Sequence, residues 1–401
     1  MEATQTVALR AATVNSPTLR HDVDAVDKRT IPALFVAATL EHSAQTAMRW
    51  KRRGIWDAVS WTDYAAAVRE VGCALIALGL QRGGRVAVLS ENRPEWLYVD
   101  LGAQSVGCIS VGIDVSESAE RVADILNDCG ARVLFVDSTE QLDAASPVLT
   151  NAPVLECIVH FDPRVGQAET KKQIVDFTQF RASGRQFDGQ HSTRWETEAG
   201  LARAADIAIM TYQAKAGGVR VSQRDLVRQI DAMTQQCPGV VGDEQVSLLP
   251  LNKASERCFS AYRPLAVGSV LNVAEGPDNL VDALREISPH TVVATLPIWQ
   301  MLHATVVTAM TDASPLGRLG YRLALDAGHG FLPGRALVRS RVKTMIGLRR
   351  ARQLLCSDAS LPPELLGWYR ALGLDIAGAS GGEGWRPGDA DDSLANKESR
   401  R

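Results

Sequence analysis

The 401-residue sequence lacks the patterns that mark secreted, membrane-spanning and zinc-binding proteins. Its seven cysteines are dispersed without a Cys-x-x-Cys pair, which favours reduced, buried thiols over a disulfide framework. The seven histidines show no His-x-x-x-His pair, so no metal site is expected from them. No apolar run approaches the ~18 residues that a membrane-spanning helix requires, and no secretory signal is recognisable. These absences predict a cytoplasmic protein.

The composition is typical of a large globular protein, with 46% hydrophobic and 22% charged residues. The net charge of −3 gives no reason to expect nucleic acid as a partner. One basic run, Arg339–Arg352, departs from this balance because its cationic residues are interleaved with apolar ones. Two interpretations stay open for it: an amphipathic helix that makes peripheral contact with a membrane, or a solvated helix face.

Short β-branched runs alternate with segments of helical periodicity, which predicts an α/β fold with mostly parallel sheets. In a first α/β subdomain, residues 31–165, strands are expected at Arg85–Ser90, Cys108–Ile113, Arg132–Asp137 and Leu155–Phe161, and helices at Trp61–Leu80, from Pro94 onward, and at Glu117–Cys129. In a second, residues 201–384, strands are expected at Asp206–Tyr212, Gln245–Leu251, Ser269–Ala274 and Thr291–Leu296, and helices at Ser222–Gln236, Ala254–Leu265 and Leu280–Ile287.

Three polar segments border these subdomains. Residues 1–30 are predicted to be a mobile leader. Residues 166–200 are rich in Gln, Gly and Arg and predict a surface linker excursion between the halves. Residues 385–401 are charged and lack apolar periodicity, which predicts a disordered tail.

Four segments of the sequence carry recognisable motifs. They are Asn92-Arg93-Pro94-Glu95-Trp96, DIAIMTYQAKAGGVRV from Asp206, LPLNKASER from Leu249, and SPHTVVATLPIWQMLH from Ser288. Together they resemble the AMP-binding region of long-chain acyl-CoA synthetases, members of the adenylate-forming superfamily. The resemblance covers about residues 31–384 and implies the N-terminal domain of such an enzyme, built of two α/β subdomains, with the C-terminal lid domain absent. The implied activity is ATP-dependent fatty acid–CoA ligation, which uses ATP, Mg²⁺ and CoA.

The phosphate loop of that family, Y-T-S-G-T-T-G-x-P-K-G, is eroded in this sequence. Tyr212 is followed by Gln-Ala-Lys-Ala-Gly-Gly, so the loop hydroxyls are missing. A phosphate cradle directs N–H groups, hydroxyls and a lysine at negative charge, so their loss predicts an impaired site. Lys215, Gly217 and Gly218 are candidates for a degenerate ATP-binding nest, with a plain surface turn as the alternative. Lys253, a candidate for substrate binding, replaces the family's histidine.

Three further positions bear on the resemblance. Trp299 matches an aromatic residue that gates the acyl tunnel in some long-chain members, although a core aromatic is the alternative. Ser357 and Asp358 replace small residues that line the family's adenine pocket. The final motif, G-Y-G-[ML]-T-E, reads GASGGE and keeps only Glu383, a candidate for ATP binding and weak metal ligation. A solvated residue in a glycine-rich turn is the other interpretation of Glu383.

These observations predict a long-chain acyl-CoA synthetase-like protein that is catalytically impaired or inactive, with a scaffold, regulatory or acyl-binding role. No residue is nominated as catalytic, and no cofactor is assigned unless the family activity survives. A fatty acid or acyl-adenylate and a protein partner on the lid-facing surface are the expected partners. The alternative is a residual fatty acid–CoA ligase whose lid domain is supplied in trans.

Overall fold

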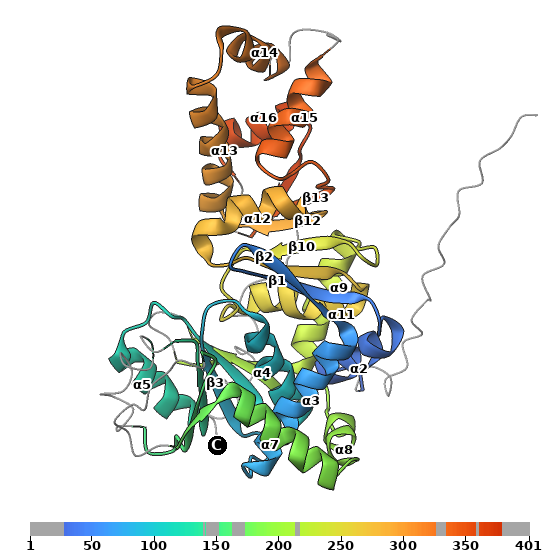
Figure 1. Cartoon of the computed structure of the whole chain (residues 1–401), viewed down its shortest axis with the longest axis vertical. Helices are drawn as coiled ribbons and strands as arrows, with labels where there is room; N and C mark the ends of the chain where they lie inside the picture. The colour runs from blue at the N-terminus through green and yellow to red at the C-terminus, as the bar shows by residue number, and fades with distance from the viewer. Residues whose placement is uncertain are drawn as a thin grey trace, which may run out of the picture.

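The computed structural model describes residues 28–138, 141, 152–162, 173–212, 217–325, 334–357 and 361–378. Two sheets lie one above the other along the long axis, and a group of helices, α13 to α16, forms one end of the molecule (Figure 1). The α/β class and the mostly parallel sheets that the sequence predicts are confirmed. The expected tail and most of the expected leader lie outside the described residues. Within them, Thr30 caps the first described helix, α2 (Ile31–Glu41).

Among the residues that the structure describes, the first sheet has seven strands, which are parallel except for one pair at an edge. Its order is β7 (Gln173–Asp176), β6 (Cys157–His160), β5 (Val133–Val136), β3 (Arg85–Leu89), β4 (Ile109–Ile113), β8 (Ile207–Thr211) and β9 (Val219–Ser222). The strands β8 and β9 pair antiparallel. The short, almost fully buried strands β5 and β6 consist largely of Val, Ile, Leu and Phe, as expected for a sheet covered on both faces.

The second sheet repeats this arrangement. Its order is β14 (Ile376–Gly378), β13 (Gln353–Cys356), β12 (Thr291–Ala294), β10 (Glu244–Ser247), β11 (Val270–Val273), β1 (Thr46–Arg52) and β2 (Ile55–Ser60). Here the strands β1 and β2 form the antiparallel edge pair. Each sheet therefore consists of five parallel strands extended by one hairpin.

Relative to the predicted subdomains, the two sheets exchange these hairpins, because each hairpin pairs with the sheet of the other subdomain. The hairpin β1–β2 precedes the first sheet in sequence but pairs with β11 of the second, whereas β8–β9 pairs with β4 of the first. The sheets therefore differ from the sequence-based division into residues 31–165 and 201–384. Strand periodicity identifies the strands but carries no information about which distant strand each one pairs with.

The helices cover the sheets and connect their strands. They are α3 (Trp61–Ala77), α4 (Pro94–Ser105), α5 (Ala119–Cys129), α7 (Phe177–Gln190), α8 (Arg194–Gly200), α9 (Gln223–Gln236), α10 (Ala254–Glu256), α11 (Arg263–Val267), α12 (Leu280–Ile287), α13 (Leu296–Thr311), α14 (Pro315–Leu325), α15 (Arg335–Met345) and α16 (Pro363–Ala371). A π-helical segment, Arg257–Tyr262, joins α10 to α11, and a 3₁₀ turn, Pro277–Asn279, precedes α12. The helix expected from Pro94 begins at that residue.

The described part of the expected linker, residues 173–200, is ordered secondary structure and corrects that expectation. It forms β7, α7 and α8. Helix α7 packs against α3, where Arg181 Nε lies 2.6 Å from Glu70 Oε2. A Cβ on Gly184 would lie only 1.9 Å from the Glu70 carbonyl oxygen, so the two helices approach at this glycine. The polar composition of this segment reflects ion pairs between packed helices, which a pattern of apolar residues cannot reveal.

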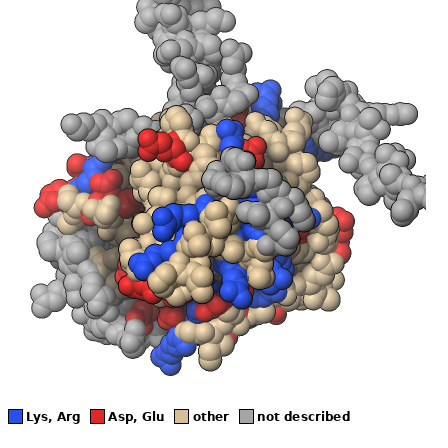
Figure 2. Space-filling view, turned by 90° about the horizontal axis from the view of Figure 1, so that it is seen from above, with Lys and Arg blue, Asp and Glu red and all other residues tan. Residues whose placement is uncertain are grey.

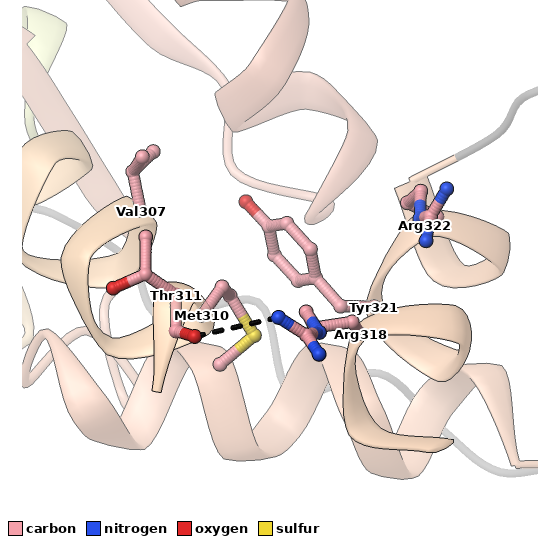
Figure 3. Close-up of a pocket in the computed structure, with 6 residues that line it drawn as sticks. All are labelled: Val307, Met310, Thr311, Arg318, Tyr321 and Arg322. Atoms are coloured by element: carbon pink, nitrogen blue, oxygen red, sulfur yellow. Dashed lines mark hydrogen bonds between the residues drawn. The ribbon is translucent and has the colours of Figure 1, made fainter. Parts of the chain in front are cut away.

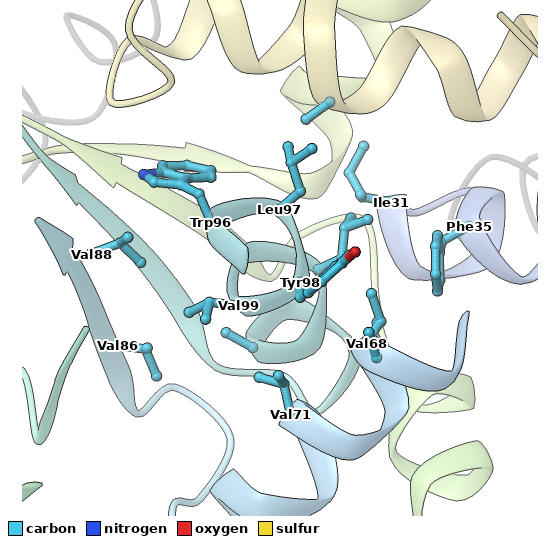
Figure 4. Close-up of a cluster of buried hydrophobic side chains, with 14 of the residues drawn as sticks. Ile31, Phe35, Val68, Val71, Val86, Val88, Trp96, Leu97, Tyr98 and Val99 are labelled. Carbon is cyan, nitrogen blue, oxygen red and sulfur yellow. The ribbon is translucent and has the colours of Figure 1, made fainter. Parts of the chain in front are cut away.

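The largest core lies between the first sheet and helices α2, α3 and α4. Ile31 and Phe35 of α2, Val68 and Val71 of α3, and Trp96 of α4 all belong to this core, and Figure 4 shows Phe35 beside Val68. A separate core surrounds Trp299 at the end of the molecule that carries α13 and α16. The first core also includes Met48 of β1 and Leu271 and Val273 of β11, so it continues into the contact between the two sheets.

Candidate functional site

The loop that follows β10 lies against the carboxyl end of β3 and joins the two sheets. Asn92, just beyond β3, is the bridging residue. Its Nδ2 donates to Ser247 Oγ at 2.9 Å and to the Leu249 carbonyl oxygen at 2.7 Å. Its Oδ1 accepts from the Leu251 N–H at 2.9 Å. The carboxyl ends of parallel strands meet here, where ligands of open α/β sheets usually bind.

A buried ion pair lies behind this bridge. Arg257 and Asp100 both have side chains with 0% exposure, and Arg257 Nη1 lies 3.4 Å from Asp100 Oδ1. Arg257 Nε donates to the Leu251 carbonyl oxygen at 2.8 Å, and its guanidinium lies 4.6 Å from the ring centroid of Trp96. Tyr262 donates its hydroxyl to Asp100 Oδ2 at 2.7 Å. The retained motif residues Trp96 and Arg257 therefore hold each other and the β10 loop in place.

Glu256 is the second buried acid of this junction, with 1% exposure. Its Oε1 accepts hydrogen bonds from the hydroxyls of Ser247 and Ser260. Burial raises the pKa of Glu256 to about 7, although the two serine hydrogen bonds act in the opposite direction. Glu256 therefore titrates near neutral pH inside the protein, at the join between the sheets.

The β8–β9 connection is where the eroded phosphate loop falls. Lys215 lies outside the described residues; Gly217 is exposed and Gly218 is half-buried. Thr211 and Val219 pair directly across the hairpin. The Tyr212 hydroxyl donates to Asp128 Oδ2 at 2.6 Å, and a Cβ on Gly218 would lie 2.7 Å from that hydroxyl. The space beside Gly218 is thus filled by a tyrosine that is held by a carboxylate.

Lys253 is exposed at the start of α10, close to Asp114. Burial alone would raise the pKa of Asp114. Hydrogen bonds from Ser116 and Asn252, together with the charge of Lys253, outweigh that effect and lower it. Asn252 Nδ2 lies 3.1 Å from Asp114 Oδ2. Asp114 is therefore held by Ser116 and Asn252 and lies within range of the charge of Lys253.

Trp299 lies in the core, with 0% exposure. Its Nε1 donates to the Ala294 carbonyl oxygen at 3.1 Å, and its ring meets Tyr369 edge to face with centroids 5.3 Å apart. The Tyr369 hydroxyl donates in turn to the Trp299 carbonyl oxygen. Every polar group of this pair is satisfied inside the fold, which is the environment of a core aromatic.

A surface cleft of about 360 Å³ lies between α13 and α14, away from the junction of the sheets. Figure 3 shows its lining side chains, Val307, Met310, Thr311, Arg318, Tyr321 and Arg322. No motif in the sequence predicts this cleft, and periodicity alone could have shown only that α14 is amphipathic.

Other candidates can be placed only in part. Glu383 and Asp358 lie outside the described residues, whereas Ser357, which is partly buried, follows β13 directly. In the described part of the chain, no group of three His, Cys, Asp or Glu side chains could hold a metal ion. No helix among the described residues has both the length and the apolar character needed to cross a membrane.

Asp100, Ser247 and Ser260 were missed at the sequence level. Asp100 had a detectable signal, because it is a carboxylate in the middle of the largely apolar helix PEWLYVDLGAQS, whereas Glu95 lies in the first turn. The two serines had none, since a serine in a polar or mixed segment is unremarkable until its partner is known.

Comparison with known proteins adds to this geometry. Residues 35–381 match the family described as AMP-binding enzyme. The chain is 24% identical over 378 residues to the long-chain-fatty-acid–CoA ligase ACSBG2 of Rattus norvegicus, a match that covers 86% of this chain and 55% of that protein. The chain thus spans little more than half the length of this curated relative.

Two solved structures share the fold. The A domain of a carboxylic acid reductase from Segniliparus rugosus, in complex with AMP and a co-purified carboxylic acid, matches with a TM-score of 0.69 at 14% identity. That match covers 90% of this chain and 63% of the other. The N-terminal domain of FACL13 from Mycobacterium tuberculosis matches with a TM-score of 0.61 at 14% identity, over 86% of this chain and 74% of the other.

Proposed function

Because the chain belongs to the family of AMP-binding enzymes, we propose that it keeps an acyl-CoA synthetase framework but does not form acyl-adenylate by itself. One observation carries the proposal: four of the retained motif residues are buried inside the fold. Trp96, Arg257 and Trp299 have 0% exposure and Glu256 has 1%. Trp299 Nε1, Arg257 Nε and Glu256 Oε1 bond to other groups of the chain. Packing inside the fold therefore accounts for the retention of these residues without a bound nucleotide.

The substituted positions lie at the open edge and offer little to a nucleotide. At the described part of the loop, a triphosphate would find the N–H groups of Gly217 and Gly218 and, across the edge, the ammonium of Lys253. The carboxylates of Asp128 and Asp114 stand near these groups and would repel phosphate. These residues do not fit an ATP–magnesium complex. Losing one donor from a preorganised site costs about 3 kcal/mol of the barrier, and here several are lost.

We propose a scaffold or regulatory role for such a protein, with a protein partner on the edge that carries Lys253. Charge reversal at Lys215 and Lys253 should then weaken a partner captured by pull-down. If capture of the partner is equally strong with the charge-reversed protein, the partner binds another surface of the molecule.

Pyrophosphate release with ATP, Mg²⁺, CoA and a panel of fatty acids tests the catalytic half of the proposal. The rat ligase ACSBG2 serves as the active control. We expect turnover far below the ordinary enzyme range of about 1–10³ per second. Turnover within that range by the chain alone would overturn the proposal. Turnover that appears only on adding the C-terminal domain of a related ligase would overturn the scaffold or regulatory role and favour a ligase whose lid is supplied in trans.

Isothermal titration calorimetry with ATP–Mg²⁺ and with long-chain fatty acids, run separately, tests binding. We expect a dissociation constant for ATP no better than about millimolar. A micromolar isotherm that is lost in Glu383→Ala but kept in Glu364→Ala, an exposed position on α16, would show that the nucleotide site survives. Binding of fatty acid without ATP would define the role as acyl binding.

A further inference from the structure

The end of the molecule formed by α14 and α15 carries positive charge that neither helix offsets. The two helices contain no Asp or Glu, and their basic residues are Arg318, Arg322, Arg335, Arg339, Arg341 and Lys343. Burial and the neighbouring Arg335 lower the pKa of Arg339, and burial and Arg339 lower the pKa of Lys343. In the view onto this end, Lys and Arg side chains lie across the centre of the face (Figure 2).

A stripe of leucines lies beside this charge and faces solvent. Leu316, Leu319 and Leu323 follow one another at the spacing of a single helix face, with exposures of 81%, 49% and 36%. Among the residues of α14, Ala324 alone is classed as buried. An amphipathic helix of a globular domain normally turns its leucines towards the core. Helix α14 turns them outward.

The second helix holds α14 in this position. Arg335 Nε and Arg339 Nε both donate to the carbonyl oxygen of Ala324, at 2.9 Å and 3.3 Å. Leu337 of α15 is 58% exposed and adds to the apolar surface. The leucines and the arginines are therefore presented together by a fixed pair of helices.

Arginines also border the cleft between α13 and α14. Arg318 and Arg322, one helical turn apart, line it together with the apolar side chains of Val307 and Met310 (Figure 3). The Arg318 guanidinium reaches the Thr311 carbonyl oxygen at 3.5 Å. The cleft thus combines an apolar wall with two guanidinium groups, and guanidinium binds phosphate oxygens well.

We propose that α14 and α15 form a docking surface for an anionic phospholipid bilayer. The leucine stripe enters the boundary between headgroups and acyl chains, and the arginines contact lipid phosphates. Charge favours this occupant over a second copy of the chain, because two such surfaces would bring like charges together. The proposal is independent of the catalytic state of the protein.

Flotation of the full chain with vesicles tests it. We expect the protein to float with phosphatidylcholine–phosphatidylglycerol vesicles, to bind vesicles of phosphatidylcholine alone far more weakly, and to be released at high salt. Arg318→Glu combined with Arg322→Glu should lower the partition coefficient about thirtyfold or more. Leu316→Ser combined with Leu319→Ser should also lower the partition coefficient. The size of this loss should depend less on salt concentration than the loss caused by the arginine substitutions.

The matched control is Arg220→Glu combined with Arg228→Glu, two exposed arginines of β9 and α9. It should float like the wild type, and circular dichroism should show all variants folded. Equal flotation of the Arg318/Arg322 variant and the wild type would overturn the proposal, as would no flotation of the wild type. Sedimentation velocity that shows a dimer lost in the leucine variant, without vesicle binding, would assign the surface to self-association and overturn it too.

Discussion

Replacing Glu256 with glutamine should remove a pH dependence of stability that this one buried carboxyl group creates. Its pKa is about 7 in the folded protein, against 4.5 for an unperturbed glutamate. Because the folded pKa is the higher one, the protonated form is favoured by folding. The associated stability is fully present below about pH 4.5 and is lost as the pH rises to about 7.

The size of the effect follows from the pKa difference. At about 1.36 kcal/mol per pKa unit, the full loss is about 3 kcal/mol. About 2 kcal/mol of it falls between about pH 5.5 and about pH 8. Glutamine keeps the shape of the side chain and an acceptor for Ser247 and Ser260, but it cannot ionise.

Urea unfolding followed by tryptophan fluorescence, repeated across this pH range, measures the effect. The free energy of unfolding of Glu256→Gln should fall by about 2 kcal/mol less than that of the wild type between about pH 5.5 and about pH 8. The exposed control Glu41→Gln should follow the wild type. Parallel pH profiles for Glu256→Gln and the wild type would refute the reasoning, because they would mean that the group titrates alike in the folded and unfolded chains.

Two further predictions concern packing. Arg257→Met should cost about 3–5 kcal/mol by urea unfolding, since it strands a buried carboxylate; a loss below about 1 kcal/mol, or one matched by the exposed Arg220→Met, would contradict this. Gly184→Ala should destabilise by about 1–3 kcal/mol because its Cβ would meet the Glu70 carbonyl oxygen. Gly189→Ala, in the same helix with open space around it, should instead stabilise by up to about 1 kcal/mol; equal effects of the two would show that α3 and α7 are not in contact.

The sequence predicted individual elements well because their signals are local. The strand expected at Cys108–Ile113 is observed at Ile109–Ile113, and Pro94 begins its helix as expected. Helix α7 escaped prediction because Arg181 and its neighbours bond to a helix more than 100 residues away. The exchange of hairpins escaped for the same reason, since pairing partners leave no mark on the periodicity of a strand.

In the candidate site too, local features could be predicted from the sequence, whereas contacts between distant residues could not. The motif around Asn92 and Arg257 could be found in the sequence, but its structural use could not, because it depends on Asp100 and on the loop after β10. Trp299 could be recognised as a motif position, and its partner Tyr369 is 70 residues away. The functional roles of Lys215, Gly217, Gly218, Lys253 and Glu383 remain predictions.

The exchange of hairpins has a consequence for how the chain matures on the ribosome. Arg49 of β1 meets Asn272, which is made 223 residues later. At a synthesis rate of about 5–20 residues per second, the first hairpin waits roughly 10–45 seconds for its sheet. During that interval its edge is open to pairing with other nascent chains. Slower elongation between the two segments should therefore increase the demand for chaperones. The segment that needs their protection is the first hairpin, near the beginning of the chain.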